Sequence, residues 1–374
     1  MKNIFKIIVC VMAVSLTFSS CTKTSKRIND LTIVQALAVD GNENNAEVSL
    51  QYLNLFAGSS ASDQLSGNIT SLTKGKGSNI SEAVFNTSKT VSNDVFFGQN
   101  KLIVFGFDWS KNNVSSGIDY LLKSKDSRPD VLAVIGYPSA EEIVRSKEKS
   151  AQIPAENIYS LIKLGEENGH AAAVTVADIL NLYNDETSDI FFPVLKAEKD
   201  NVKCIGTAVF SGDKYAAFLG EEETFAFLTV KNRFKRGIIT FDVPNIGKVS
   251  VEVTSSRAKK SIEIKNSKII FRIKIKTRLI INEAGKTVKK PLKEEDNILI
   301  QTACEKKLES ICNSTVKKCF NNRSDPFMCA RYLYYEDIGL YNKLKDNWQN
   351  YLNNIEVKSE VSSSLQRVSN NTAT

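Results

Sequence analysis

The first 21 residues constrain this chain more than any other stretch. A lysine-bearing start is followed by residues from Ile7 to Phe18 that are almost all apolar, and Ser19-Ser20 then leads into Cys21. A basic head, a short apolar core and small residues are the three parts of a secretory signal peptide. The apolar run is too short to cross a bilayer as a helix, which needs about 20 such residues. The sequence therefore predicts a signal peptide over residues 1–20 and a body that begins at Cys21.

The cysteine directly after the small pair makes this segment resemble a bacterial lipoprotein signal. In that class a diacylglycerol is attached to the cysteine thiol and the chain is cut just before it. Phe18 departs from the pattern, because such signals usually carry an aliphatic residue there. The alternative is an ordinary signal peptide cut near Ser20. On the lipoprotein interpretation Cys21 is the lipidation site, residues 21–30 are a polar tether, and no later apolar segment adds a membrane span.

The composition is that of a globular body, with 42% hydrophobic and 24% charged residues. With about 100–200 residues per domain as a guide, the length indicates two or three domains. The net charge is +7, but Lys and Arg are mixed with Asp and Glu along the whole body. A dedicated nucleic-acid binder would gather its basic residues on one face, so we expect no nucleic-acid partner.

The cysteines of the body do not form a regular framework. Apart from Cys10 and Cys21, the chain has five: Cys204, Cys304, Cys312, Cys319 and Cys329. An odd number excludes a complete set of disulfides, and the absence of CxxC spacing and the single His170 argue against a zinc site. Three of the five share the apolar face of one predicted helix, which indicates core packing. A disulfide such as Cys312–Cys329 remains the alternative.

The start of the body carries a hairpin pattern. Residues 32–40 and 47–56 are rich in strand-forming side chains on either side of an Asp-Gly turn, which predicts two paired strands. Residues 57–77 are rich in Gly, Ser and Thr and are predicted to be mostly loop. Ser78 or Ser81 is expected to cap the helix that follows.

Further along, strand and helix patterns alternate. Apolar strands at 102–105 and 131–135 are each followed by a helical pattern, which indicates an N-terminal α/β domain over residues 31–150. The middle region, residues 151–245, carries two short helices and a hairpin over 205–219.

The last third changes to strands followed by helices. Strands are predicted at 249–253, 261–264 and 268–281. A helix follows over 293–320, and a second one over Tyr335–Leu352. A closing strand ends a C-terminal α+β domain over residues 246–368. The predicted fold class is α+β and multi-domain, with about three domains, mixed sheets with packed helices, and a C-terminal antiparallel sheet plus long helices.

Motifs of catalysis are missing from the sequence. The chain has no GxSxG, HExxH or Walker pattern, so we expect no catalytic residue, no cofactor and no metal site. One strand is unusual because Arg272, Lys274, Lys276 and Arg278 alternate with apolar residues. Such a strand shows its cations on one face, either to anionic lipid or an acidic partner, or simply to solvent.

Several stretches in the body match one protein family in order. They are Asn29-Asp30-Leu31, Ala36–Asp40, Phe96–Gly106, Gly117-Ile118-Asp119, Arg128, Gly206–Phe210, Asp213-Lys214, Glu223-Thr224, Asp325-Pro326-Phe327, Asn347-Trp348 and Val357. Together with the signal and Cys21 they resemble the Ger(x)C family, the lipoprotein C subunits of spore-germination nutrient receptors. Gln99, where a histidine is expected, and Cys329 and Ala330 depart from the family pattern.

The resemblance implies a three-domain, non-enzymatic subunit needed for nutrient-triggered germination. It would lie on the outer face of the spore inner membrane, attached through diacylglyceryl-Cys21 and assembled with two integral-membrane subunits of the A- and B-type. The resemblance is strongest over Phe96–Gly106, and this stretch suggests partner contacts at Phe97, Gly98, Asn100 and Lys101. A purely structural role of that block is the alternative.

Two other functions remain open. A solute-binding lipoprotein of a transporter would need a ligand cleft between two similar lobes, and the two halves of this chain differ in pattern. A lipoprotein enzyme would need a nucleophile–base motif, which the sequence does not offer.

Overall fold

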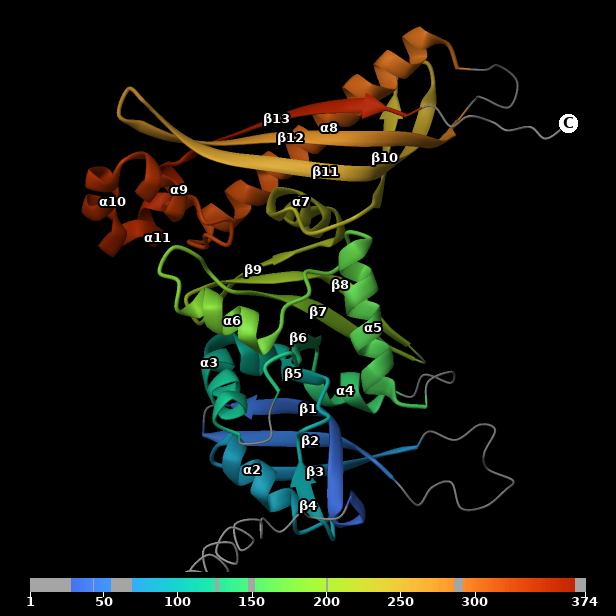
Figure 1. The fold of residues 1–374 in the computed structure, drawn as a ribbon, viewed down its shortest axis with the longest axis vertical. Helices are drawn as coiled ribbons and strands as arrows, with labels where there is room; N and C mark the ends of the chain where they lie inside the picture. Colours follow the sequence, from blue (N-terminus) through green and yellow to red (C-terminus); the bar gives the residue numbers. More distant parts are fainter. Residues whose placement is uncertain are drawn as a thin grey trace, which may run out of the picture.

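Two sheets, one above the other along the long axis, form the molecule (Figure 1). The computed structural model describes residues 28–42, 44–54, 69–124, 128–146, 152–199, 201–285 and 292–366. The signal peptide, Cys21 and most of the tether lie outside these residues. Mixed sheets with packed helices confirm the predicted α+β class.

The lower sheet has nine strands. They are β1 (Leu31–Asn42), β2 (Asn45–Leu53), β3 (Thr70–Gly77), β4 (Asp94–Phe96), β5 (Leu102–Gly106), β6 (Leu132–Tyr137), β7 (Phe191–Glu198), β8 (Asn201–Ser211) and β9 (Lys214–Leu219). Their order is β3-β2-β1-β5-β6-β7-β8-β9, and β4 pairs with the start of β1. The central strands β1, β5, β6 and β7 are parallel, with antiparallel strands on both sides. The predicted hairpins β1–β2 and β8–β9 are confirmed.

Helices cover both faces of this sheet, as its alternating side chains require. The helices are α2 (Ile80–Thr87), α3 (Phe107–Lys123), α4 (Ala140–Arg145), α5 (Pro154–Glu167), α6 (Val176–Tyr183) and α7 (Glu221–Lys231). Leu37 and Ile103 pack on the side of α2, α3 and α6, whereas Ala38 and Val104 pack on the side of α4 and α5. Each central strand is therefore apolar on both faces.

The nine-stranded sheet continues across the predicted domain limit at residue 150. β6 comes from before that limit and β7 from after it, and the two pair directly, Ile135 opposite Val194. The division into domains at 31–150, 151–245 and 246–368 remains a prediction.

The upper sheet has four strands in the order β10 (Gly237–Val243), β11 (Gly247–Lys265), β12 (Lys268–Ala284) and β13 (Glu356–Leu365). The first three are antiparallel, and β13 joins parallel to β12. The two short strands predicted at 249–253 and 261–264 are parts of the single long strand β11.

The predicted long helix over 293–320 is confirmed as α8 (Glu294–Asn321), whereas a single helix over Tyr335–Leu352 is wrong. That segment belongs to α9 (Cys329–Glu336), α10 (Ile338–Leu344) and α11 (Trp348–Tyr351). Asp337 interrupts the helix because its backbone is extended and its side chain accepts a hydrogen bond from the Leu340 N–H. An extended aspartate of this kind begins a new helix.

The outer edge of β13 is closed by side chains of α8. The N–H groups of Ser359, Val361 and Ser363 donate to Asn313, Glu309 and Glu305, at 2.8, 2.9 and 2.7 Å. The acceptors recur every four residues along α8, so they lie in one row on the helix. This row satisfies an edge that would otherwise be open to pairing with another chain.

The prediction of a loop over residues 57–77 is wrong for its second half, which forms β3; residues 57–68 lie outside the described residues. The glycines of β3 allow α2 to lie directly on the strand, because a Cβ on Gly75 would be 2.0 Å from the Ala83 carbonyl oxygen. The cap of α2 is Asn79, not Ser78 or Ser81, and its side chain accepts from the Glu82 N–H at 2.9 Å.

Candidate functional site at the junction of the two sheets

A buried aspartate, Asp325, organises the loop between α8 and α9. Its Oδ1 accepts the Cys329 N–H at 2.9 Å, and its Oδ2 accepts the Ala330 N–H at 2.9 Å and the Trp348 Nε1–H at 3.1 Å. Only 2% of the residue is exposed. One carboxylate therefore fixes the start of α9 and the position of α11.

A second buried carboxylate, Asp189, joins this loop to the nine-stranded sheet. The Asp325 N–H donates to Asp189 Oδ2 at 2.6 Å, and the Asp189 N–H donates to the Asp325 carbonyl at 3.1 Å. Asp189 Oδ1 accepts the Gly212 N–H of the β8–β9 turn at 2.8 Å. Asp189 thus holds together the start of β7, the β8–β9 turn and the C-terminal loop.

Burial moves the ionisation of both carboxyls. It raises the pKa of Asp325 to about 6, and the N–H donors of Ala330 and Cys329 only partly oppose it. Burial also raises the pKa of Asp189. The two acids therefore hold their protons more tightly than in water.

A half-buried lysine faces the same loop. Lys231, the last residue of α7, donates from Nζ to the Pro326 carbonyl at 2.6 Å, and its Nζ lies 4.7 Å from the centre of the Phe191 ring. Burial, with a smaller contribution from the nearby cations Lys260 and Arg233, lowers its pKa to about 7. The ring face attracts the ammonium and offsets part of its lost hydration.

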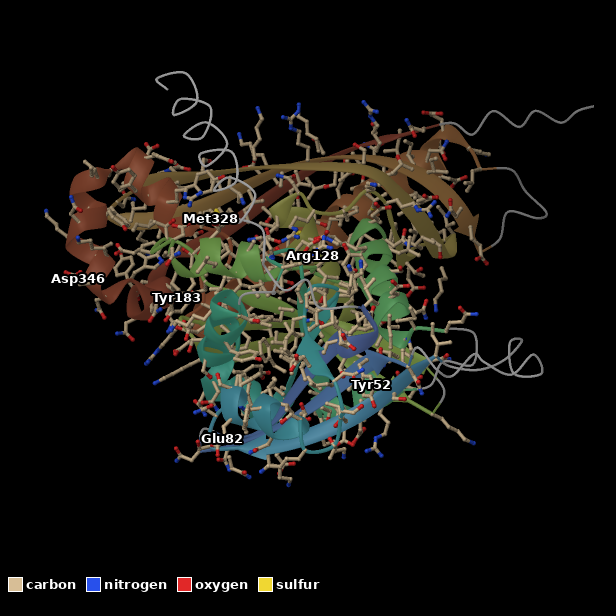
Figure 2. The ribbon with its side chains drawn as sticks, turned by 60° about the horizontal axis from the view of Figure 1, so that its bottom comes forward. Tyr52, Glu82, Arg128, Tyr183, Met328 and Asp346 are labelled. Atoms are coloured by element: carbon tan, nitrogen blue, oxygen red, sulfur yellow. The ribbon has the colours of Figure 1, made fainter. Side chains whose placement is uncertain are left out.

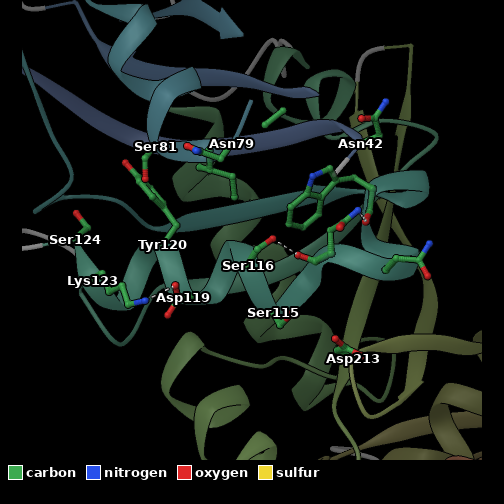
Figure 3. Close-up of a pocket in the computed structure, with 15 residues that line it drawn as sticks. Asn42, Asn79, Ser81, Ser115, Ser116, Asp119, Tyr120, Lys123, Ser124 and Asp213 are labelled. Carbon is green, nitrogen blue, oxygen red and sulfur yellow. Dashed lines mark hydrogen bonds and ion pairs between the residues drawn. The ribbon is translucent and has the colours of Figure 1, made fainter. Parts of the chain in front are cut away.

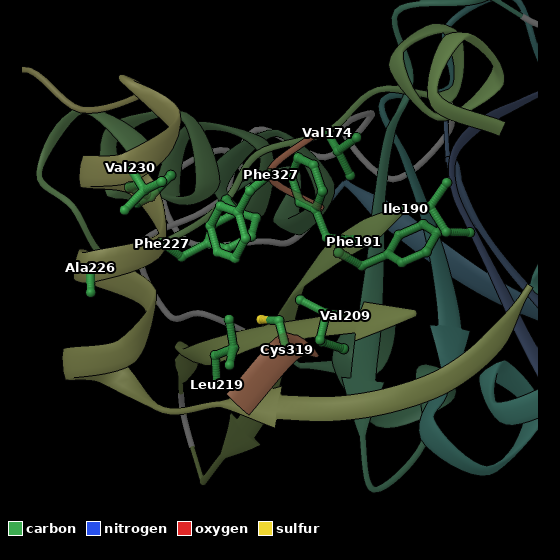
Figure 4. Close-up of a cluster of buried hydrophobic side chains, with 14 of the residues drawn as sticks. Val174, Ile190, Phe191, Val209, Leu219, Ala226, Phe227, Val230, Cys319 and Phe327 are labelled. Atoms are coloured by element: carbon green, nitrogen blue, oxygen red, sulfur yellow. The ribbon is translucent and has the colours of Figure 1, made fainter. Parts of the chain in front are cut away.

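Aromatic side chains from β7, α7 and the loop before α9 pack together at this junction (Figure 4). The ring centres of Phe191 and Phe227 are 5.0 Å apart, and those of Phe227 and Phe327 are 5.3 Å apart. Phe191 belongs to β7, Phe227 to α7 and Phe327 to the loop before α9. The junction is a continuous packed core and not a hinge of loose loops.

The start of α7 is attached to α8 and to β8. Glu223 accepts the Gly220 N–H at 2.9 Å and the Lys318 ammonium at 2.8 Å. The hydroxyl of Thr224 donates to that of Thr207 at 3.1 Å. These contacts link Gly206–Phe210 and Glu223-Thr224, two of the stretches that resemble the family, to the same junction.

The predicted partner-binding block lies elsewhere, in the turn before β5. Phe97 and Asn100 are buried, and the Asn100 N–H donates to the Phe97 carbonyl at 2.9 Å. Gly98 lies against the Phe96 ring, and the Lys101 N–H donates to the Gln35 carbonyl at 2.9 Å. The half-buried Gly98 and Lys101 offer more surface to a partner than Phe97 and Asn100. Partner binding by this block remains a prediction.

A polar groove of about 610 Å³ lies between α2 and α3 (Figure 3). Its walls carry mainly amide and hydroxyl side chains, among them Asn42, Asn79 and Ser81, with the phenol of Tyr120. It lies within the lower half of the molecule and reaches Asp213 in the β8–β9 turn, next to the Gly212 that donates to Asp189.

The five body cysteines are unpaired, and all but Cys204 are buried. Burial raises the pKa of Cys312 to about 12, so its thiol stays protonated and acts as an apolar group. Within the ranges that the structure describes, no three His, Cys, Asp or Glu side chains are grouped to hold a metal ion. No helix in those ranges is long and apolar enough to span a membrane.

Two family models together match nearly the whole chain. The spore germination protein N-terminal domain matches residues 24–197, and the C-terminal domain described as spore germination B3/GerAC like matches residues 205–369. The chain belongs to the Ger(x)C family. The two matches meet in the β7–β8 hairpin, inside the nine-stranded sheet.

Relatives in the Ger(x)C family match over most of their length. Spore germination protein KC of Bacillus subtilis is 25% identical over 90% of this chain and 89% of its own. Spore germination protein B3 of the same organism is 23% identical over 90% of this chain and 91% of its own. The crystal structure of the GerBC protein, at 17% identity, superposes with a TM-score of 0.60 over 88% of this chain and 97% of that chain. The fold is therefore that of GerBC.

Several of the stretches that carry the sequence resemblance to the Ger(x)C family meet at the junction. Asp325, Phe327 and Trp348 come from the C-terminal stretches and contact one another or the same neighbours. Sequence reasoning missed Asp189 and Lys231. A lysine at a helix end and an aspartate after a polar stretch are ordinary surface patterns, so no local signal indicated that Asp189 is buried or that Lys231 contacts the junction loop.

Proposed function

We propose that this chain is the lipid-anchored, non-enzymatic C subunit of a spore-germination nutrient receptor. The observation that carries the proposal is the near full-length match to spore germination proteins, in a chain whose sequence places a lipoprotein-type cysteine before the body. The partners would be two integral-membrane subunits of the A- and B-type. The body would lie on the outer face of the spore inner membrane.

The position of Cys21 supports attachment by the lower end of the molecule. An extended chain spans at most about 3.6 Å per residue, so Cys21 stays within about 25 Å of Ile28. Ile28 directly precedes β1, whose first residue, Leu31, pairs with β4 at that end (Figure 1). The upper sheet would then point away from the bilayer.

The arrangement of the polar groups favours a subunit over a solute-binding lipoprotein. The buried Asp189 and Asp325 and the half-buried Lys231 at the junction all hydrogen-bond to backbone groups. The polar groove between α2 and α3 lies within one half and not between two similar lobes.

Spores lacking the gene test the proposal, complemented by the unchanged chain or by Cys21→Ala. We expect nutrient-triggered germination to be lost without the gene, restored by the unchanged chain and reduced by Cys21→Ala, whose product should leave the membrane fraction. A receptor-independent trigger is the control and should act on all strains. A normal nutrient response in the deletion strain would contradict the proposal, and membrane retention of Cys21→Ala would contradict the anchor.

A further inference from the structure

The outer face of the four-stranded sheet carries pairs of like charges. The antiparallel register of β11 and β12 places Arg257 opposite Lys276 and Lys259 opposite Lys274, and all four side chains are exposed. Figure 2 shows nitrogen-tipped side chains standing out from this sheet at the top of the view. Like charges directly opposite each other destabilise a strand pair, so this arrangement lowers the stability of the free protein.

Nearby acids neutralise only one end of this surface. Glu263 and Glu360 both pair with Arg272, and Lys274 reaches Glu360 only at 3.9 Å. Among the described residues, no acidic side chain forms an ion pair with the four remaining cations, Arg257, Lys259, Lys276 and Arg278, which we call the basic cluster.

Hydroxyl side chains lie opposite Lys276 and Arg278, and the nearest acids on this face, Glu252 opposite Ile280 and Glu360 opposite Lys274, lie two residues further along the strands. Across the sheet, Arg278 faces Ser255 on β11 and Ser364 on β13, and Lys276 faces Ser362.

We infer that the basic cluster binds an acidic segment of a protein partner in extended conformation. Alternate side chains of a strand repeat every 6.6 Å or so, which is also the repeat of alternate carboxylates in an extended partner. A segment lying along β12 would therefore place one carboxylate beside each of Lys276 and Arg278. The partner's charge would remove the repulsion that the free sheet carries.

A protein is favoured over a lipid surface by the place of this sheet. It lies at the end of the molecule opposite to β4 and the start of β1 (Figure 1). This step rests on the proposed function, in which Cys21 holds that opposite end at the membrane.

The test uses the full-length chain in detergent and two labelled decapeptides, one alternating Glu and Ser, the other Gln and Ser. The double variant Lys259→Gln/Lys276→Gln is compared with Lys214→Gln/Lys306→Gln, which removes two exposed lysines elsewhere. We expect the Glu peptide alone to bind, about fivefold or more weakly to the first variant and within about twofold of normal to the second. The first variant should melt at the same temperature or higher, because one charge is removed from each of the two like-charge pairs.

Equal binding of the two peptides, or unchanged binding by Lys259→Gln/Lys276→Gln, would overturn the inference. Tighter binding of oligothymidylate, or of phosphatidylglycerol vesicles, through the same residues would replace the acidic protein by a nucleic acid or a lipid. None of these outcomes depends on the lipid anchor. A failure here is therefore distinct from a failure of the Cys21→Ala experiment.

Discussion

At the scale of single residues, the carboxyl group of Asp325 is subject to two opposing influences. Three N–H donors converge on its two oxygens, which favours the carboxylate, while burial favours the neutral acid. Burial is the stronger of the two influences, since the pKa is raised to about 6. The carboxyl group of Asp325 thus fixes the positions of α9 and α11, but its burial lowers the stability of the folded protein.

We expect Asp325→Asn to lower the free energy of unfolding by about 2–3 kcal/mol. The amide keeps one acceptor oxygen, but its NH₂ group would face a backbone N–H and leave that donor unsatisfied. Urea unfolding followed by circular dichroism measures the loss. Asp346→Asn, the same chemical change at an exposed position, is the control and should stay within about 0.5 kcal/mol.

The pH dependence of that loss follows from the raised pKa. Between about pH 4 and pH 6 the folded chain binds a proton at Asp325 that the unfolded chain, with a pKa near 3.9, has released. Stability from this group therefore falls as pH rises through that window and is constant above it. The advantage of the unchanged protein over Asp325→Asn should be smaller at pH 7 than at pH 4.5. A larger advantage at pH 7 would mean that the three donors outweigh burial.

At the scale of elements, the α8–β13 contact depends on single side-chain acceptors. Glu309→Ala removes the partner of the Val361 N–H and should cost about 1–2 kcal/mol, because a strand edge is left unsatisfied. Glu309→Gln retains an acceptor oxygen and should cost less than half as much. Thermal unfolding of the two variants decides the matter. Equal losses would mean that Glu309 acts through charge or packing and not through this hydrogen bond.

The close contact of α2 with β3 makes a second element-scale prediction. Gly75→Ala should cost about 2 kcal/mol or more, because its Cβ would lie 2.0 Å from the Ala83 carbonyl oxygen and force the helix away from the strand. Gly220→Ala is the matched control, since its Cβ would have nothing closer than 4.0 Å. Denaturant midpoints of both variants provide the measurement, and equal midpoints would contradict the proposed contact.

These elements also show how far sequence reasoning reaches. The core strand at Leu102–Phe105 and the helix α8 were predictable, because their apolar patterns are local. β3 was not predictable, because its glycines are typical of a loop and their role appears only once the position of α2 is known. The row of polar acceptors on α8 was not predictable either, because its role depends on β13, a distant strand formed by residues 356–365. Asp189 and Asp325, 136 residues apart, pair for the same long-range reason.

At the scale of the whole molecule, the two sheets share one core. The main cluster of buried apolar side chains runs from Leu37 in β1 through Phe227 in α7 to Phe271 in β12. The family matches meet inside the lower sheet, so the hairpin partner of β7 comes from the C-terminal match. A destabilising substitution in one half should therefore also lower the stability of the other half.

The two tryptophans test this coupling, because Trp109 lies in α3 of the lower half and Trp348 in α11 of the upper half. Trp348→Phe removes the indole N–H that donates to Asp325 and leaves Trp109 as the single fluorescent reporter. We expect the urea midpoint reported by Trp109 to fall, by an amount equivalent to about 1–2 kcal/mol, and to coincide with the midpoint from circular dichroism. If Trp109 instead reports an unchanged midpoint while circular dichroism shows an earlier transition, the halves unfold separately. The junction would then connect the sheets without making them one cooperative unit.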